Sequence, residues 1–363
     1  MLCRLEPRAN ASRAMFYAAP FLAMVLTVAT GLLLFALLGK NVWTSFQAFF
    51  VTPISTLYGL TELLLKATPL MLIGVGLAVC YRARIWNIGA EGQYVMGAVA
   101  ATAFALHVGA GDNSASANYL LLFGTMVAGA LGGMAWAAIP ALLRTRYNTN
   151  IILTSLMLVY AAQLIESWLV FGPMQDPKGM NFPQTPALAS CVTLPVIVHG
   201  TRLTLAFPFT LVLLAAAQVF LNRSYIGYKL RVAGEAEPAA RYAGFSASRM
   251  VWVAMLISGA CAGIAGMAEV AGPMGQLTDQ ISVGYGFAAI IVAYVGRLSP
   301  VGIFLASILL ALFYLGGYQA QVSLNLPAAI SQSFQGLLLF YLLAANVLIN
   351  YRVRWVSWRG AQG

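Results

Sequence analysis

Long apolar segments fill almost the whole chain, and short polar or glycine-rich stretches separate them. The apolar runs are continuous and do not alternate every second residue, so the pattern predicts helices and not the strands of a barrel. A helix needs about 20 apolar residues to cross a bilayer, and most runs come close to that length. The pattern therefore predicts an all-α polytopic membrane protein with about ten transmembrane helices, of which 285–295 is short enough to be a half-helix. The predicted spans are 16–38, 61–79, 93–108, 119–143, 151–170, 203–221, 250–271, 285–295, 301–317 and 328–349.

Composition favours a single membrane domain. Of the 363 residues, 61% are hydrophobic and 8% are charged, whereas soluble domains carry about 25% charged residues. The spans leave no room for a further soluble domain of ~100 residues. We therefore expect one transmembrane domain over 16–351, between an N-terminal end, 1–15, and a C-terminal end, 352–363. The first apolar run exceeds the core of about 7–15 residues of a signal peptide, so it is read as a retained helix.

The basic residues predict the topology. With the ten spans in place, all of the 20 lysines and arginines except Lys40, Lys66, Lys178 and Arg202 fall on one side of the membrane. Basic residues accumulate on the cytoplasmic side, so both ends of the chain are predicted to be cytoplasmic. The net charge of +10 follows largely from this orientation, and it is no evidence for nucleic-acid binding.

No group of residues points to a metal site or to an enzyme. The 4 cysteines and 2 histidines lack the spacing of metal ligands, and cysteines in or beside apolar runs are expected to be small buried residues. No Ser-His-Asp, His-Glu-x-x-His or paired-carboxylate pattern occurs. The chain also lacks the Gly-x-x-x-x-Gly-Lys-Ser/Thr loop, so ATP hydrolysis would require another chain.

Three further patterns predict local structure. Glu62 and Lys66 are four residues apart in the order that favours an ion pair on one helix face. The outer connection 171–202 contains five prolines and is expected to consist of turns. Glycines four residues apart allow helix backbones to approach closely. Such pairs are Gly129 with Gly133 and Gly259 with Gly263.

The most polar interruption of the apolar pattern is the segment 81–93, YRARIWNIGAEGQ. Polar groups are costly in hydrocarbon, so an interruption of this kind is expected to line protein or a water-filled cavity. In one interpretation Asn87 caps the next helix, and Glu91 lies in its first turn, where the helix dipole favours a carboxylate. In the other, Asn87, Glu91 and Gln93 lie at a pathway or gate, and the glycines permit an unwound backbone. Because the segment begins at the cytoplasmic end of a helix, a gate or packing element is preferred to a substrate site.

The second informative segment is the cytoplasmic loop 222–249, which is far longer than the usual helix-to-helix turn. Gly234, Glu235, Glu237 and Pro238 are typical of a helix start, and Gly244 is typical of a helix end. The predicted helix, 237–243, is too short to persist alone in water. Its packing partner could be the same chain or another protein.

Several of these motifs resemble those of a known family. The string Glu237-Pro-Ala-Ala-x-x-x-Gly244 resembles the Glu-Ala-Ala loop of ABC importer permeases, with proline in the place after the glutamate. The string Asn-Ile-Gly-Ala-Glu-Gly-Gln at 87–93, together with Gly-Tyr-Gly-Phe and Val-Gly-Arg-x-x-Pro within 282–300, is similar to permeases of nucleoside and simple-sugar ABC importers. These permeases are related to those for branched-chain amino acids. The resemblance extends over about 61–349.

The resemblance implies a type II importer fold with two related halves, in a bacterial inner (plasma) membrane. It also implies a second permease subunit, an ATP-binding cassette ATPase that holds ATP and Mg²⁺, an extracytoplasmic substrate-binding lipoprotein, and no cofactor in this chain. The solute would be small, neutral and polar, most simply a nucleoside, with a simple sugar as the alternative. Candidate pathway or gate residues are Asn87, Gly89, Glu91, Gly92, Gln93, Gly284, Tyr285, Gly286 and Phe287. Candidate ATPase-coupling residues are Gly234, Glu235, Glu237, Pro238, Ala239, Ala240, Tyr242 and Gly244.

A secondary transporter driven by protons or sodium is an alternative of another class. It would use carboxylates inside the membrane, and the candidates are Glu91, Glu166 and Glu269. Glu166 and Glu269 lie near the predicted outer ends of their helices, so we expect both to be solvated. A membrane enzyme is a further alternative, for which no catalytic pattern is present.

Overall fold

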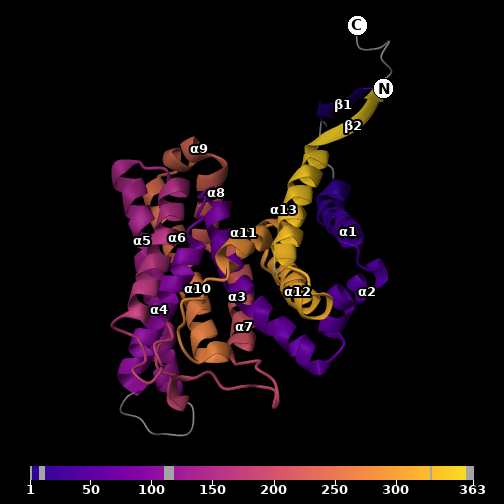
Figure 1. The fold of residues 1–363 in the computed structure, drawn as a ribbon. Coiled ribbons are helices and arrows are strands. Elements are labelled where there is room, and N and C mark those ends of the chain that lie inside the picture. Colours follow the sequence, from indigo (N-terminus) through magenta and orange to yellow (C-terminus); the bar gives the residue numbers. More distant parts are fainter. Residues whose placement is uncertain (1, 8–12, 110–117, 328, 357–363) are drawn as a thin grey trace. The chain divides into compact units, whose positions relative to one another are not determined.

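The computed structural model describes residues 2–7, 13–109, 118–327 and 329–356 (Figure 1). The chain divides into two compact units. One comprises Met1–Ser55 together with Leu312–Gly363, and the other is Thr56–Ala311. The candidate residues of both segments singled out in the sequence belong to the second unit, which is described after the first.

Each predicted span corresponds to a helix. Within the described residues, seven helices are long and apolar enough to cross a membrane. They are α1 (Arg13–Leu37), α3 (Leu57–Arg82), α5 (Tyr119–Tyr147), α6 (Ile151–Phe171), α7 (Ala206–Arg223), α10 (Ala247–Glu269) and α12 (Pro300–Leu324). The other predicted spans are α4 (Ala90–Gly109), α11 (Tyr285–Val295) and α13 (Ala329–Asn350). Residue 328, the predicted start of the last span, lies outside the described residues.

The first unit is built around α1 and α13. Phenylalanine rings fill its interior, because Phe49 stacks on Phe334 with centroids 4.4 Å apart, and Phe35 lies 5.8 Å from the same ring. Thr30 and Tyr341 share a hydrogen bond of 2.7 Å between the two helices. The short helix α2 (Val42–Phe46) lies between Phe35 and Phe49 in the chain and was not predicted.

The ends of the chain form a two-stranded antiparallel sheet that the prediction did not include, whereas the apolar part of the chain is helical as predicted. Strand β1 (Leu2–Pro7) pairs with β2 (Tyr351–Val356), and Leu2 is opposite Val356. Pairing between segments so far apart in sequence leaves no local signal, because neither strand has its partner nearby. The sheet therefore brings the two ends of the chain together.

Glycines hold the core of the second unit together. The helices α4, α5 and α10 approach so closely that a Cβ on Gly133 would collide with Gly259, and one on Gly97 would collide with Gly263. Gly129 also contacts the Gly263 backbone. The two predicted close-packing pairs are therefore confirmed, and they pack against each other. Inside a membrane the hydrophobic effect does not drive helices together, so van der Waals contact between closely spaced backbones stabilises their association.

The connection between α6 and α7 consists of turns, as its prolines predict, with one short 3₁₀ helix, Ser190–Val192. It runs along the segment after α10, where Thr185 N donates to Leu277 O at 2.9 Å and Leu194 N donates to Ala271 O at 2.7 Å. Near its end, Arg202 donates two hydrogen bonds, of 2.9 and 2.6 Å, to the Glu62 carboxylate of α3. These bonds raise the pKa of the Arg202 guanidinium.

The predicted pair of Glu62 with Lys66 is therefore wrong. Glu62 binds Arg202, whereas Lys66 lies 3.4 Å from the Glu269 carboxylate of α10. Both residues are on α3, but each finds its partner in a segment distant in sequence. A bidentate guanidinium bond is stronger than an exposed pair within one helix.

Candidate functional site

The two glycine-rich segments of the sequence meet at the beginnings of α4 and α11. Glu91, in the first turn of α4, is completely buried. Its Oε1 accepts hydrogen bonds from Ser282 Oγ at 2.7 Å and from Gly284 N at 2.9 Å, and its Oε2 accepts one from Gly286 N. Gly284 is the N-cap of α11 and has no side chain to cap the helix. The Glu91 carboxylate therefore serves as the cap of α11, and it also lies in the positive field at the start of its own helix.

Asn87 joins the extended segment before α4 to two neighbouring helices. Its Nδ2 donates to Gln93 Oε1 at 3.1 Å and to Ser258 Oγ of α10 at 3.0 Å. Its Oδ1 accepts from Gly89 N at 3.0 Å and from Gln93 Nε2 at 3.2 Å. A side-chain amide has two donor hydrogens and two acceptor lone pairs, so Asn87 has no bonding capacity left for a solute. We refer to Asn87, Glu91, Gln93, Ser258, Ser282, Gly284 and Gly286 as the helix-start cluster.

Three glycines allow the backbones in this cluster to come together. A Cβ on Gly89 would lie 2.9 Å from Ser155 Cβ of α6, and one on Gly92 would lie 3.0 Å from Val159 Cα. A Cβ on Gly286 would collide with the Glu91 backbone. Close approach explains these three glycines, because none of them has a left-handed φ; Gly284 does, with a φ of 87°.

Tyr285 and Phe287 point in different directions from the first turn of α11. Tyr285 is buried, and its hydroxyl accepts a hydrogen bond of 2.8 Å from Lys66 Nζ. Lys66 also pairs with Glu269, so α3, α10 and α11 share one polar contact. Phe287 is 38% exposed and takes no part in it.

The nine predicted pathway or gate residues are thus brought into one region, with Phe287 at its surface. Asn87, Glu91 and Gln93 are all 0–1% exposed, and their polar atoms bind other protein groups. Sequence reasoning missed the two serines of the cluster, Ser258 and Ser282, and also Ser155, whose Oγ accepts a hydrogen bond of 3.3 Å from Ile88 N. Ser258 directly precedes the Gly259 packing position, which is the one signal that could have placed it on an interior face.

The expectation that Glu166 and Glu269 are solvated is wrong. They are 2% and 6% exposed, respectively. The long connection and the segment after α10 are hydrogen-bonded to each other at this end of the unit. Glu269 is neutralised by Lys66.

The loop 222–249 contains two helices, α8 (Tyr225–Glu235) and α9 (Glu237–Tyr242). The predicted helix at 237–243 is present, and Gly244 ends it with a φ of 77°. The prediction that Gly234 and Glu235 begin this helix is wrong, because they end α8. Gly234 is needed there since its Cα lies against the Arg82 and Ala83 backbone.

The loop is packed by its own chain. Lys229 lies 4.2 Å above the Tyr225 ring and 5.2 Å from Phe245, and Phe245 N donates to Ala240 O at 2.9 Å. Ala240 is 2% exposed, whereas Tyr242 is 97% exposed. Pro238 is also exposed, and the side chains of Glu237 and Ala239 lie outside the described part. The exposed surface of α9 therefore centres on Tyr242 and Pro238.

Arg82 connects this loop to the helix-start cluster. It is the last residue of α3, directly before the extended segment. Its Nε donates to Leu298 O, beyond the end of α11, at 3.1 Å, and its Nη1 donates to Asn222 Oδ1 at 3.3 Å. The same segment carries Trp86, which stacks on Tyr294 of α11 with centroids 5.9 Å apart. Arg82 and Trp86 therefore link the extended segment to α11 and to Asn222 at the start of the loop.

The apolar helices and the two buried helix starts define a polytopic helical membrane protein. Residues 59–343 match the family described as "Branched-chain amino acid transport system / permease component". The chain belongs to this family, and the predicted resemblance is confirmed. Proteins of this family are transport subunits and not enzymes.

Curated relatives match over most of their length. The glucose ABC transporter permease protein TsgB13 of Haloferax volcanii is 33% identical over 360 residues, which cover 96% of this chain and 93% of TsgB13. The guanosine ABC transporter permease protein NupP of Bacillus subtilis is 27% identical, covering 93% and 94% of the two chains. The nucleoside ABC transporter permease protein NupB of Lactococcus lactis is 25% identical, covering 82% of each.

Proposed function

We propose that this chain is the translocation subunit of an ATP-driven importer for a small neutral polar solute, with a nucleoside as the first candidate. The observation that carries the proposal is the family match over 59–343, together with relatives named as guanosine and nucleoside permeases. The string at 87–93, which resembles the nucleoside-type branch, supports the same assignment. A simple sugar is the second candidate, because TsgB13 is named as a glucose permease.

A separate ATPase would bind ATP and Mg²⁺ and dock on the loop 222–249. The chain contains no phosphate-binding loop of its own. The docking surface would be α9, where Tyr242 and Pro238 are exposed. Because Ala240 is buried, it would support the shape of α9 and would not itself contact the ATPase.

The remaining partners are a second permease subunit and an extracytoplasmic binding lipoprotein, in a bacterial inner membrane with both chain ends in the cytoplasm. The lipoprotein would deliver solute at the outer connection 171–202. This connection is hydrogen-bonded to Glu62 of α3 through Arg202 and to residues 271–278 through backbone N–H and C=O groups. Docking there would thus act on the segment that leads into α11.

The helix-start cluster would act as a gate element and not as the solute-binding surface. Its amide and carboxylate groups are buried and bind one another, so a solute would not find free partners there in this conformation. Movement of α8 and α9 would reach the cluster through Arg82. Two arrangements of α4 against α11 would then correspond to inward and outward access.

Uptake by proteoliposomes tests the proposal. The chain would be reconstituted with the ATPase, second permease and lipoprotein encoded beside it, and uptake of labelled guanosine and glucose would be measured with and without ATP. ATP-dependent guanosine uptake, lost when the ATPase is inactivated, is expected; glucose uptake alone would favour the second candidate. Uptake driven by an ion gradient without ATP would overturn the proposal and support a secondary transporter.

A further inference from the structure

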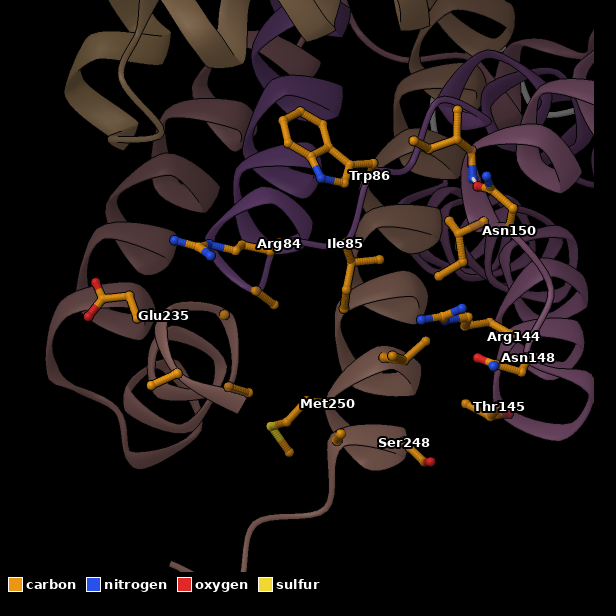
Figure 2. Close-up of a pocket in the computed structure, with 18 of the residues that line it drawn as sticks. Arg84, Ile85, Trp86, Arg144, Thr145, Asn148, Asn150, Glu235, Ser248 and Met250 are labelled. Atoms are coloured by element: carbon orange, nitrogen blue, oxygen red, sulfur yellow. Dashed lines mark hydrogen bonds between the residues drawn. The ribbon is translucent and has the colours of Figure 1, made fainter. Parts of the chain in front are cut away.

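A cavity of about 930 Å³ lies beside the loop 222–249 (Figure 2). Four parts of the second unit form its walls. They are the extended segment at 83–86, the turn between α5 and α6, the end of α8 with the start of α9, and the beginning of α10. We call it the basic cavity. The helix-start cluster is separate from it, because none of the cluster residues lines its walls.

Three arginines line the basic cavity, namely Arg84, Arg144 and Arg146. The one carboxylate among the lining residues, Glu235, is already paired with Arg231 at 2.9 Å. Figure 2 shows Arg84 and Arg144 on opposite walls, and the Arg144 guanidinium extends toward Ile85. All three arginines are exposed to solvent, so the walls of this open cavity carry an excess of positive charge that no lining group neutralises.

These arginines differ from neighbouring basic residues, which have structural partners. Arg82 binds three oxygen atoms on other segments, and Lys229 lies over two aromatic rings. Within the described part of the chain, the guanidinium groups of Arg84 and Arg146 take part in no hydrogen bond or ion pair, and that of Arg144 uses one nitrogen, to Thr149 O at 3.2 Å. Orientation in the membrane accounts for positive charge on this side. It does not account for unpaired guanidinium groups around one cavity.

Two long helices also begin at the basic cavity. Ile151 starts α6 and Ala247 starts α10, and both residues line the walls. The N-terminus of a helix presents unpaired N–H groups and a partial positive charge. Asn148 and Asn150 add side-chain amides nearby. The helix starts thus supplement the arginines with neutral hydrogen-bond donors.

We propose that the basic cavity binds a phosphate-bearing anion. Guanidinium groups match the geometry of phosphate oxygens and bind them in pairs, and phosphate is the common anion at helix starts. Trp86 forms part of the wall and is 48% exposed, so an apolar or aromatic part of the ligand would have a surface to contact. The same chemistry is offered by a free phosphate compound and by the headgroup of an anionic phospholipid.

Binding to the purified full-length chain in nanodiscs tests this proposal. In zwitterionic phosphatidylcholine discs, AMP and inorganic pyrophosphate would be titrated by equilibrium dialysis, with adenosine as the uncharged comparison. In discs containing phosphatidylglycerol, native mass spectrometry would measure the lipid that stays bound. Saturable binding of AMP or pyrophosphate identifies a free phosphate compound, whereas retention of phosphatidylglycerol alone identifies a lipid headgroup.

A matched pair of variants decides whether the cavity is responsible. R84Q/R146Q removes two unpartnered charges from the cavity, and R223Q/R249Q removes two exposed charges from the same side outside it. We expect phosphate binding to be at least tenfold weaker in the first variant and unchanged in the second. If the double variant misfolds, the single variant R146Q should still show a smaller loss of binding. Equal losses in both variants, or no phosphate binding by the unaltered chain, would overturn the proposal. So would a defect of R84Q/R146Q confined to assembly with the ATPase, which would assign the cavity to an acidic protein segment.

Discussion

Replacing Glu91 by glutamine should loosen the first turn of α11 while leaving the shape of the side chain unchanged. The amide oxygen can still accept from Ser282 Oγ and Gly284 N, but the amide nitrogen then faces Gly286 N–H. Two donors cannot bond to each other. The Gly286 N–H is left buried without an acceptor, and the negative charge at the start of α11 is lost.

The size of the effect follows from these two losses. An unpaired buried donor costs about 1–3 kcal/mol, and a charge at a helix start contributes about 0.3–1 kcal/mol. We therefore expect the first turn of α11 to be destabilised by roughly 1.3–4 kcal/mol. Since about 1.4 kcal/mol corresponds to a factor of ten, amide exchange at Gly284 and Gly286 should become roughly 10- to 1,000-fold faster.

Hydrogen–deuterium exchange of the chain in nanodiscs measures this effect. The peptide that contains the start of α11 should exchange faster in E91Q, whereas a peptide from the glycine-packed part of α10 should not. Glu235→Gln is the matched control, because its carboxylate is mostly exposed and pairs only with Arg231 on the same helix. If E91Q leaves exchange at Gly284 and Gly286 at the level of the unaltered chain, the capping role of Glu91 is refuted.

Three other substitutions test separate parts of the structure. Tyr242→Glu should reduce ATP-dependent uptake at least tenfold with normal membrane insertion, because this exposed side chain lies on the proposed docking surface. Ala240→Glu should instead lower the yield of folded protein, because Ala240 is buried. Measuring membrane insertion and uptake for both variants distinguishes the two effects. Gly263→Leu should abolish folding, since its Cβ would collide with the backbone of α5, whereas Gly336→Leu, which meets no neighbour, should have little effect in a detergent melting assay. Arg202→Met should lower stability by about 1–3 kcal/mol, because it leaves the buried Glu62 carboxylate without its two hydrogen bonds; an unchanged melting temperature would contradict this estimate.

The helices were predictable because their signal is local. Each apolar run corresponds to a helix, and the range predicted for the half-helix, 285–295, is that of α11. The positions of glycines and polar residues also indicated where the helices are interrupted. The pairing of β1 with β2 and the helix α8 were not predicted, because an amphipathic surface helix and a strand between chain ends produce no long apolar run.

The identity of the site residues was more predictable than their bonding. Glycine and polar residues drew attention to 87–93 and 284–287, and the structure brings these segments into contact. The sequence did not indicate that Glu91 caps a helix almost two hundred positions later. The choice of Lys66 as partner for Glu62 failed for the same reason, since the nearest charge in sequence is not the nearest charge in the folded chain.

The reciprocal amide pair of Asn87 and Gln93 constrains how this protein can change during evolution. Each amide satisfies the other, and Asn87 also binds Ser258. Losing one partner leaves buried polar atoms without a hydrogen bond, which lowers stability. Replacing both residues with apolar groups of similar shape can leave the stability nearly unchanged. An alignment of relatives should therefore show positions 87 and 93 covarying, with few sequences in which only one of the two has lost its amide.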